Sequence, residues 1–272
     1  MNDLRETAVQ AARTTKWIGR PYRFFDTVGS TNDLLKQDVK QMPAEVLPAG
    51  TVYLTDFQAQ GRGRLQRSWE APSGTSLLLS LLLRPDWPAR QSAWLTMLAA
   101  LSVAEAIEAQ TGLAVKLKWP NDVVLEQHGR YHKVCGILAE GNITTEQRLD
   151  YAIIGMGINV NIPYESLPAA TTPATSLLVA TGKPVARLPF LVTLWERLEV
   201  WVETAVNNQS PQPAWNQRLV TLGQTVHVNQ MGKGELLTGV AENTDAWGHL
   251  LVRDVRGQLH TIGAGDVTLR DA

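Results

Sequence analysis

The pattern of hydrophobic and polar positions predicts helices and strands over residues 4–206. Leucine, tryptophan and valine recur at helical spacing over residues 187–206, which makes this the clearest amphipathic helix in the chain. A second long helix is expected over residues 89–111. It should end before Gly112, because glycine commonly follows the last turn of a helix. The leucine-rich run 76–83 has the length of a strand buried on both faces. Other expected elements are a helix at 4–15, a helix capped by residues 30–33, and strands at 23–27, 51–57, 115–119, 133–140 and 151–160.

The pattern changes after the polar, proline-bearing stretch 207–213. From about residue 219 onward, short β-type runs follow one another and are separated by glycines. This spacing is typical of a small β barrel appended to a larger domain. The five runs are 225–229, 236–241, 250–254, 259–262 and 267–269, and the glycines are Gly232, Gly234, Gly248, Gly257 and Gly265.

The composition is that of a soluble globular protein with balanced charge. Of 272 residues, 44% are hydrophobic, and 25 Lys and Arg stand against 26 Asp and Glu, which gives a formal net charge of −1. Balanced charge argues against a chain-wide electrostatic grip on nucleic acid. Residues 1–17 contain no apolar run like a signal peptide, and the stretches 77–83 and 93–104 are shorter than the ~18 residues of a membrane span. We therefore expect neither secretion nor a membrane or nucleic-acid partner.

The cysteine content indicates a reducing compartment. Cys135 is the only cysteine in the sequence, so it can close no intramolecular disulfide. No CxxC pair or cluster of Cys and His is present to hold structural zinc. A reducing, cytoplasmic location is expected.

The loop 58–69 is the first candidate for chemistry. It places Arg62, Arg64 and Arg67 within six residues, together with two glycines that let backbone amides approach a ligand. Guanidinium groups on such a loop suit carboxylate or phosphate oxygens. The alternative is a flexible, solvated basic loop. The spacing of a Walker phosphate loop is absent.

Two further segments place polar groups at strand ends. Residues 118–122 read Lys-Trp-Pro-Asn-Asp, and their position after a strand aims Asn121 and Asp122 outward. A plain turn capped by its own side chains is the alternative. Lys133 begins an apolar strand, where a lysine is often an edge or snorkelling residue.

The segment 155–161 resembles a dinucleotide-binding turn but does not meet its requirements. The third glycine is missing, and the chain runs into Pro163 rather than a helix. Gly155 and Gly157 still allow a ligand to lie against the backbone, and Asn159 offers both a donor and an acceptor to a base edge. The alternative is a simple turn at a strand end.

Taken in order, these segments resemble the biotin protein ligases. The matching motifs are Ser30-Thr-Asn32, the Gly-Arg-Gly-Arg loop from Gln58 to Trp69, Lys118-Trp-Pro-Asn-Asp122, Lys133-(x2)-Gly-Ile-Leu-(x)-Glu140 and Gly155-(x)-Gly-Ile-Asn-(x)-Asn161. The resemblance covers almost the whole chain. It implies an α+β fold, with a mixed-sheet catalytic domain of the class II aminoacyl-tRNA synthetase type at 1–218 and an SH3-like barrel at 219–272.

The resemblance also implies a reaction. A biotin–[biotin carboxyl-carrier protein] ligase joins biotin to ATP as biotinyl-5′-AMP, with Mg²⁺ on the triphosphate, and passes biotin to one lysine of a carboxylase carrier domain. The implied protein is cytoplasmic and a monomer or homodimer. Members that are also repressors carry an N-terminal winged helix, for which the stretch before Ser30 is too short, so we expect the monofunctional type without nucleic-acid binding.

Site residues carry over motif by motif. The implied biotin-binding residues are Ser30, Thr31, Asn32, Gln58, Arg62, Gly63, Arg64 and Lys133. The implied residues for ATP and the adenylate are Arg62, Arg64, Arg67, Trp69, Asn121, Asp122 and Asn159, and the catalytic residues are Lys133, Arg64 and Arg67, with no resident metal ligand. One departure is Gln66, which stands where many members have glycine.

Physical chemistry agrees with this assignment. A carboxylate that attacks an α-phosphate brings two anions together, so the site must supply cations. Because the arginines repel one another, we expect the loops 58–69 and 163–175 to be mobile until an anion arrives, and to exclude water when they close. The rival functions are a lipoate or octanoate ligase, which needs a long apolar slot, and a non-enzymatic adaptor that works through its C-terminal barrel.

Overall fold

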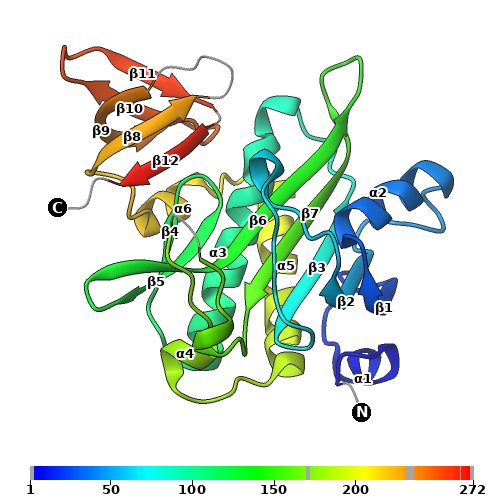
Figure 1. The fold of residues 1–272 in the computed structure, drawn as a ribbon. Coiled ribbons are helices and arrows are strands. Elements are labelled where there is room, and N and C mark those ends of the chain that lie inside the picture. Colours follow the sequence, from blue (N-terminus) through cyan, green and yellow to red (C-terminus); the bar gives the residue numbers. More distant parts are fainter. Residues whose placement is uncertain (1–2, 170–171, 231–235, 264, 270–272) are drawn as a thin grey trace.

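The chain forms two separate sheets. The structure is a computed structural model that describes residues 3–169, 172–230, 236–263 and 265–269. Seven strands lie in the order β1-β2-β3-β7-β6-β5-β4 and five in the order β11-β10-β9-β8-β12 (Figure 1). Since β1 and β2 pair in parallel and the other neighbours in the larger sheet pair antiparallel, that sheet is mixed. The strands of the larger sheet are β1 Tyr22–Val28, β2 Val52–Gln58, β3 Ser76–Leu83, β4 Val115–Lys118, β5 Asp122–Gln127, β6 Arg130–Ile143 and β7 Leu149–Asn159.

The C-terminal sheet is antiparallel throughout. Its strands are β8 Thr225–Gln230, β9 Leu236–Thr244, β10 Leu250–Asp254, β11 Leu259–Ile262 and β12 Gly265–Leu269. All five strands expected from the sequence are present, whereas the expected turn glycines at 232 and 234 lie outside the described residues. The SH3-like description and the domain boundary after residue 218 stay predictions.

Helices were predicted well where they are long. The expected helix at 187–206 is confirmed over its full length, and the expected helix at 89–111 begins as a 3₁₀ turn and becomes α-helical at Ser92. Gly112 ends that helix with a φ of 72°, a left-handed conformation that favours glycine. The helices are α1 Glu6–Ala12, α2 Thr31–Gln41, α3 Ser92–Thr111, α4 Leu177–Thr181, α5 Arg187–Val206 and α6 Gln212–Arg218.

Three elements were not predicted. Strand β5 begins at Asp122, so residues 118–122 form a tight connection within a hairpin of β4 and β5 rather than the end of a strand facing solvent. Helix α4 follows the segment 163–175, which the sequence predicted to be a loop, and α6 begins within the polar, proline-bearing stretch 207–213. The described part of the segment 163–175 contains a 3₁₀ turn at Tyr164–Ser166 and is otherwise irregular, as expected.

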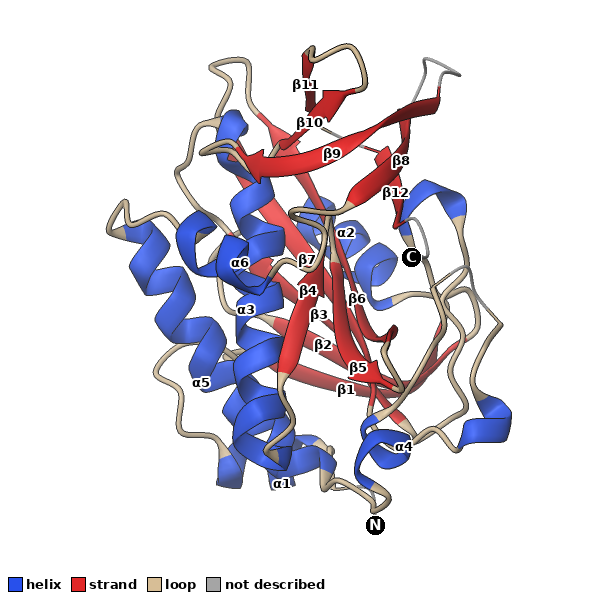
Figure 2. Cartoon of the chain, turned by 90° about the vertical axis from the view of Figure 1, so that its left-hand side faces the viewer, coloured by secondary structure: helices blue, strands red, loops and turns tan. Residues whose placement is uncertain are grey.

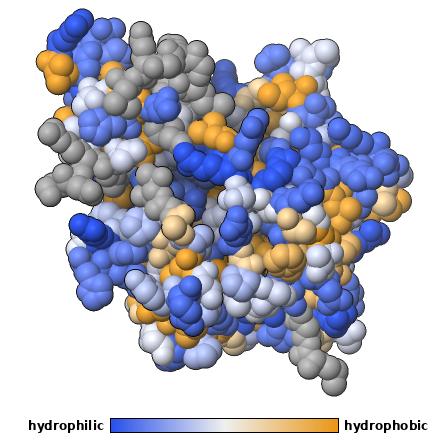
Figure 3. Space-filling view, viewed as in Figure 1, coloured by the Kyte–Doolittle hydropathy of each residue, from blue (hydrophilic) through white to orange (hydrophobic). Residues whose placement is uncertain are grey.

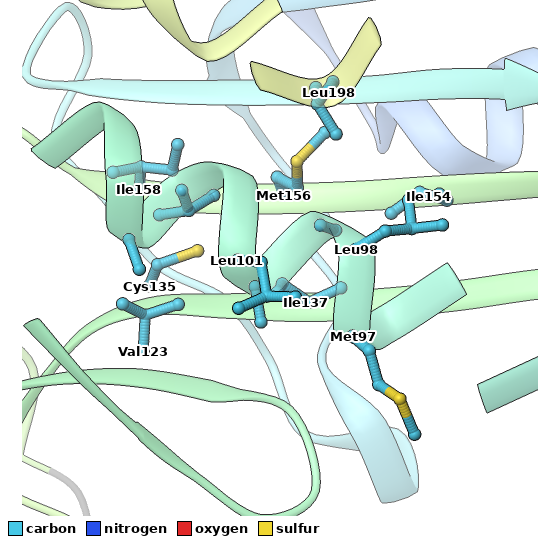
Figure 4. Close-up of a cluster of buried hydrophobic side chains, with 14 of the residues drawn as sticks. Met97, Leu98, Leu101, Val123, Cys135, Ile137, Ile154, Met156, Ile158 and Leu198 are labelled. Carbon is cyan, nitrogen blue, oxygen red and sulfur yellow. The ribbon is translucent and has the colours of Figure 1, made fainter. Parts of the chain in front are cut away.

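Helices cover both faces of the mixed sheet. Helices α3 and α5 pack together on one face and α2 on the other (Figure 2). Figure 4 shows Met97, Leu98 and Leu101 of α3 in one cluster with apolar side chains of β5, β6 and β7. Cys135 lies in this cluster, where burial raises the pKa of its thiol, as expected for a core cysteine. All eight residues of β3 are buried, which confirms the expectation from its leucine-rich run.

Helix α3 is long and apolar enough to cross a membrane by length and composition alone. This differs from the sequence estimate, because the helix extends beyond its most apolar stretch. Two thirds of its most apolar window, 67%, is buried inside the protein. Its side chains therefore form the core under the mixed sheet.

The C-terminal sheet rests on the end of this core. Trp94 Nε1 donates to Ala246 O at 3.2 Å, and Trp119 Nε1 donates to Gly248 O at 3.0 Å. The Arg90 guanidinium lies 4.8 Å from the Trp247 ring centroid. Buried residues of both sheets belong to one apolar cluster. The turn between β9 and β10 thus fixes the smaller sheet against α3.

Candidate active site

A cavity of about 1260 Å³ lies where the mixed sheet meets the C-terminal sheet. Its walls come from the start of α2, the loop 58–69, the β4–β5 connection, β6, β7, the segment 163–175 and β12. In Figure 3, strongly hydrophilic residues gather at the centre of the face, where Figure 1 places the loop 58–69. All thirteen residues selected from the sequence line it: Ser30, Thr31, Asn32, Gln58, Arg62, Gly63, Arg64, Arg67, Trp69, Asn121, Asp122, Lys133 and Asn159.

The arginine loop folds back on itself. Gly63 N donates to Arg67 O at 2.7 Å, and Trp69 N donates to Gly61 O at 2.8 Å. Leu65 and Gln66 at its tip have φ values of 55° and 61°. Because non-glycine residues are disfavoured in this left-handed region, Gln66 occupies a strained position that glycine would fill without cost.

The arginines are not left to repel one another. Arg62 forms ion pairs with Asp33 and Glu140. Burial alone would lower the pKa of Arg62, but these carboxylates hold it above its ordinary value. Arg64 donates to Asn121 Oδ1 at 3.2 Å and to Gly265 O at 3.4 Å. The expectation that the loop lacks counter-charge without a ligand is therefore wrong for Arg62.

A polar recess lies at the start of α2. Ser30 caps this helix, since its Oγ accepts from Asp33 N at 3.4 Å. Gln58 Oε1 accepts from Thr31 N at 2.8 Å. Asn32 Nδ2 donates to Leu138 O at 3.3 Å and to Glu140 Oε2 at 3.0 Å. Three of these four side chains are held by contacts with segments distant in sequence.

The glycines of β7 leave room for two side chains of the cavity wall. A Cβ on Gly157 would lie 2.5 Å from Trp69 Cε2, and a Cβ on Gly155 would lie 2.4 Å from Asn32 Oδ1. Trp69 also lies over Gly136, where a Cβ would come within 2.7 Å of its ring. Asn32 and Trp69 lie against these glycines, and Gly155 and Gly157 also line the cavity, so the expectation that a ligand can lie against this backbone stays a prediction.

Lys133 lies beside the indole of Trp69. Its Nζ is 2.6 Å from Asp122 Oδ1 and 5.5 Å from the centroid of the Trp69 ring. The backbone of Lys133 pairs with the segment 163–175, donating to Pro173 O at 2.7 Å and accepting from Thr175 N at 2.9 Å. The lysine is thus held between the β4–β5 hairpin and that segment.

Three buried polar atoms of residues that line the cavity have no hydrogen-bond partner among the described residues, and one of them, Asp122 Oδ1, is satisfied by its ion pair with Lys133, which leaves two. They are Trp69 Nε1, a donor, and Asn159 Oδ1, an acceptor. Asn159 Nδ2 already donates to Thr175 O at 2.9 Å, so its free capacity is that oxygen and one amide hydrogen. Buried polar atoms without partners are costly, and both of these belong to residues that line the cavity.

Sequence reasoning missed several residues that support this site. Lys118 lines the cavity and donates to Thr172 Oγ1 at 2.8 Å, although its motif was recognised only through Asn121 and Asp122. Glu140 was quoted within a motif without a role. Ser80 gave no signal, because a serine within a leucine run does not reveal that it contacts Thr31 and Asn32. Within the described ranges, no group of three or more His, Cys, Asp or Glu could hold a metal ion.

Comparison with known proteins decides the family. The model of the biotin/lipoate A/B protein ligase family matches residues 24–159, half of the chain. A biotin–[acetyl-CoA-carboxylase] ligase of Mycobacterium tuberculosis is 32% identical over 264 residues, covering 92% of this chain and 90% of its own. The chain belongs to the biotin/lipoate A/B protein ligase family. This confirms the resemblance drawn from the motif order.

Other relatives of the family differ in length. The bifunctional ligase/repressor BirA of Bacillus spizizenii is 35% identical over 185 residues, which are 68% of this chain but 54% of that protein. The chain thus spans about half the length of that relative. The structure of a biotin protein ligase from Aquifex aeolicus in complex with biotin and ATP superimposes with a TM-score of 0.72 at 29% identity, covering 92% of this chain and 99% of that one.

Proposed function

We propose that this protein forms biotinyl-5′-AMP from biotin and ATP and transfers biotin to a lysine of a biotin carboxyl carrier protein domain. One observation carries the proposal. A single cavity joins the polar recess of Thr31, Asn32 and Gln58 to Trp69 and Asn159, whose buried Nε1 and Oδ1 have no hydrogen-bond partner in the part of the chain that the structure describes. Such a cavity suits a small polar ring at one end and a nucleobase at the other.

The chemistry proceeds in two displacements. In the first, the biotin carboxylate attacks the α-phosphorus of ATP and pyrophosphate leaves. Lys133 and the loop arginines stabilise the negative charge that gathers on the phosphate oxygens. In the second, the acceptor lysine attacks the carbonyl of the mixed anhydride, an amide forms, and AMP leaves with the proton lost to solvent. No nucleophilic side chain of the enzyme is required.

Mg²⁺ enters with the nucleotide in this proposal. Two carboxylates of the described residues line the cavity: Asp122 already pairs with Lys133, and Glu70 accepts from Ser68 Oγ at 3.0 Å. The donor set therefore does not make a resident magnesium site, and we assign Mg²⁺ to the triphosphate alone.

A lipoate or octanoate ligase remains the second candidate, because the family includes lipoate ligases by name. The recess argues against it. Asn32 lines the cavity and its Oδ1 accepts from Ser80 Oγ, so an apolar acyl chain would leave the second lone pair of that oxygen without a donor. A ring with hydrogen-bonding groups would not.

The test is isotope exchange between pyrophosphate and ATP, followed by mass spectrometry of a carrier domain. We expect exchange with biotin and not with lipoate, and a carrier that gains one biotinyl group on lysine. Exchange with lipoate alone would establish the second candidate. Exchange with neither acid would reject both.

A further inference from the structure

Glu140 connects three side chains that come from two other segments. Asn32 Nδ2 donates to its Oε2 at 3.0 Å, Arg62 Nη2 donates to its Oε1 at 2.5 Å, and Lys36 Nζ lies 3.5 Å from Oε1. The side chain of Glu140 is one fifth exposed. Burial alone would raise the pKa of Glu140, but the hydrogen bonds from Asn32 and Arg62 outweigh it and hold that pKa below its ordinary value. Glu140 is thus an ionised carboxylate that contacts Asn32, Lys36 and Arg62 at the edge of the recess.

The Glu140 carboxylate determines how the amide of Asn32 is turned. Its Nδ2 faces Glu140 Oε2 and Leu138 O, and both of these atoms can only accept. The opposite orientation would place three acceptor oxygens together. Asn32 Oδ1 therefore faces Ser80 Oγ, which lies 2.5 Å away and donates to it. Gly155 leaves room for this oxygen, since a Cβ there would lie 2.4 Å from it.

The remaining capacity of Asn32 follows from this count. Both hydrogens of Nδ2 have acceptors, whereas Oδ1 has one donor among the described residues and a second lone pair. Because Asn32 lines the cavity, it can offer a ligand an acceptor but no donor. The recess consequently favours a ring that presents an N–H at this point.

We propose that Glu140 is a positioning residue for the ligand ring: it turns Asn32 so that its oxygen accepts a ring N–H, and holds Arg62 of the loop beside the same recess. This inference rests on the proposed function and identifies the feature of the substrate that is read, an N–H of a cyclic urea. Glu140 touches Asn32 and Arg62 and acts through them.

Glu140→Gln provides a sharp test. The substitution keeps the shape but replaces one acceptor oxygen by an NH₂ donor. Whichever way the new amide turns, a donor faces either Arg62 or Asn32, and the charge of Arg62 favours keeping the oxygen on its side. Asn32 then faces a donor and loses its orientation. Asp33→Asn is the matched control, because Asp33 pairs with the same Arg62 from the exposed side of the loop.

Pyrophosphate–ATP exchange gives KM for biotin and for ATP in each variant. We expect Glu140→Gln to raise the biotin KM by about tenfold to a hundredfold, the cost of one hydrogen bond to a charged group, with the ATP KM within about twofold. Asp33→Asn should change the biotin KM by less than about threefold. If Glu140→Gln does not fold, Glu140→Asp carries the test, since it keeps two acceptors at shorter reach and should raise the biotin KM by about threefold to tenfold.

The outcomes separate this inference from the function on which it rests. A wild-type enzyme without biotin-dependent exchange would reject the function itself. An active wild type in which Glu140→Gln shifts both KM values equally, or no more than Asp33→Asn does, would leave the function standing and assign Glu140 to stability alone.

Discussion

At the scale of single residues, the pair of Lys133 and Asp122 has separable roles. Its two charged atoms are 2.6 Å apart, and the Asp122 side chain is 16% exposed. We expect Lys133→Ala to slow adenylate formation by about 10²- to 10³-fold, because the ammonium stabilises charge that develops at the α-phosphate. Biotin-dependent pyrophosphate release measures this rate.

A double substitution distinguishes catalysis from folding. Lys133→Ala also leaves the Asp122 carboxylate without its cation, at a cost of about 1–3 kcal/mol in unfolding free energy. Adding Asp122→Asn removes that charge, so stability should recover while the rate stays low. Near-normal pyrophosphate release by Lys133→Ala would refute the catalytic assignment.

At the scale of one element, β7 supports both halves of the cavity. Gly155 lies under Asn32 and Gly157 under Trp69, two positions apart on the same face of the strand. We expect Gly155→Ala to displace Asn32 and raise the biotin KM by about tenfold or more. Gly157→Ala should displace the indole and raise the ATP KM instead. Both backbones are extended, so alanine adds bulk without a forbidden conformation.

Each glycine variant is the control for the other, since the strand, the substitution and the added volume are the same. Exchange kinetics with one substrate varied at a time measure both KM values. Equal effects on the two substrates would show that β7 positions the whole site rather than its separate halves.

Elements were predictable where burial repeats at short range. The leucine run of β3 and the apolar face of α5 are recognisable in the sequence, because apolar residues recur wherever the strand or the helix faces the core. Helix α6 does not, since its seven residues are mostly polar and only Trp215 is buried. The link from Glu140 to Asn32 spans 108 positions and depends on tertiary packing. Motif order could therefore select the cavity residues, but not the side chains that orient them.

At the scale of the whole molecule, the cavity is complete only with the C-terminal sheet in place. Val267 and Thr268 of β12 line it, and Gly265 O accepts from Arg64 of the loop. The sheet is positioned largely by the β9–β10 turn, whose Gly248 packs against Met97 of α3. Disturbing this turn should alter ligand binding at the cavity.

Two glycines in similar turns allow a matched test of this coupling. Gly248 and Gly257 have φ values of 82° and 83°, and each N–H donates at 3.0 Å to the carbonyl of an aspartate three residues earlier. A Cβ on Gly248 would lie 2.2 Å from Met97 Cε, whereas a Cβ on Gly257 would meet nothing within 4 Å. Both alanine variants should lose about 1–2 kcal/mol of unfolding free energy from left-handed strain. Gly248→Ala should lose about 1–3 kcal/mol more from overpacking, and it alone should raise the ATP KM, because it shifts the sheet that closes the cavity. Denaturant unfolding and exchange kinetics on the two variants measure both quantities, and equal KM values would show that the cavity does not depend on how the sheet is seated.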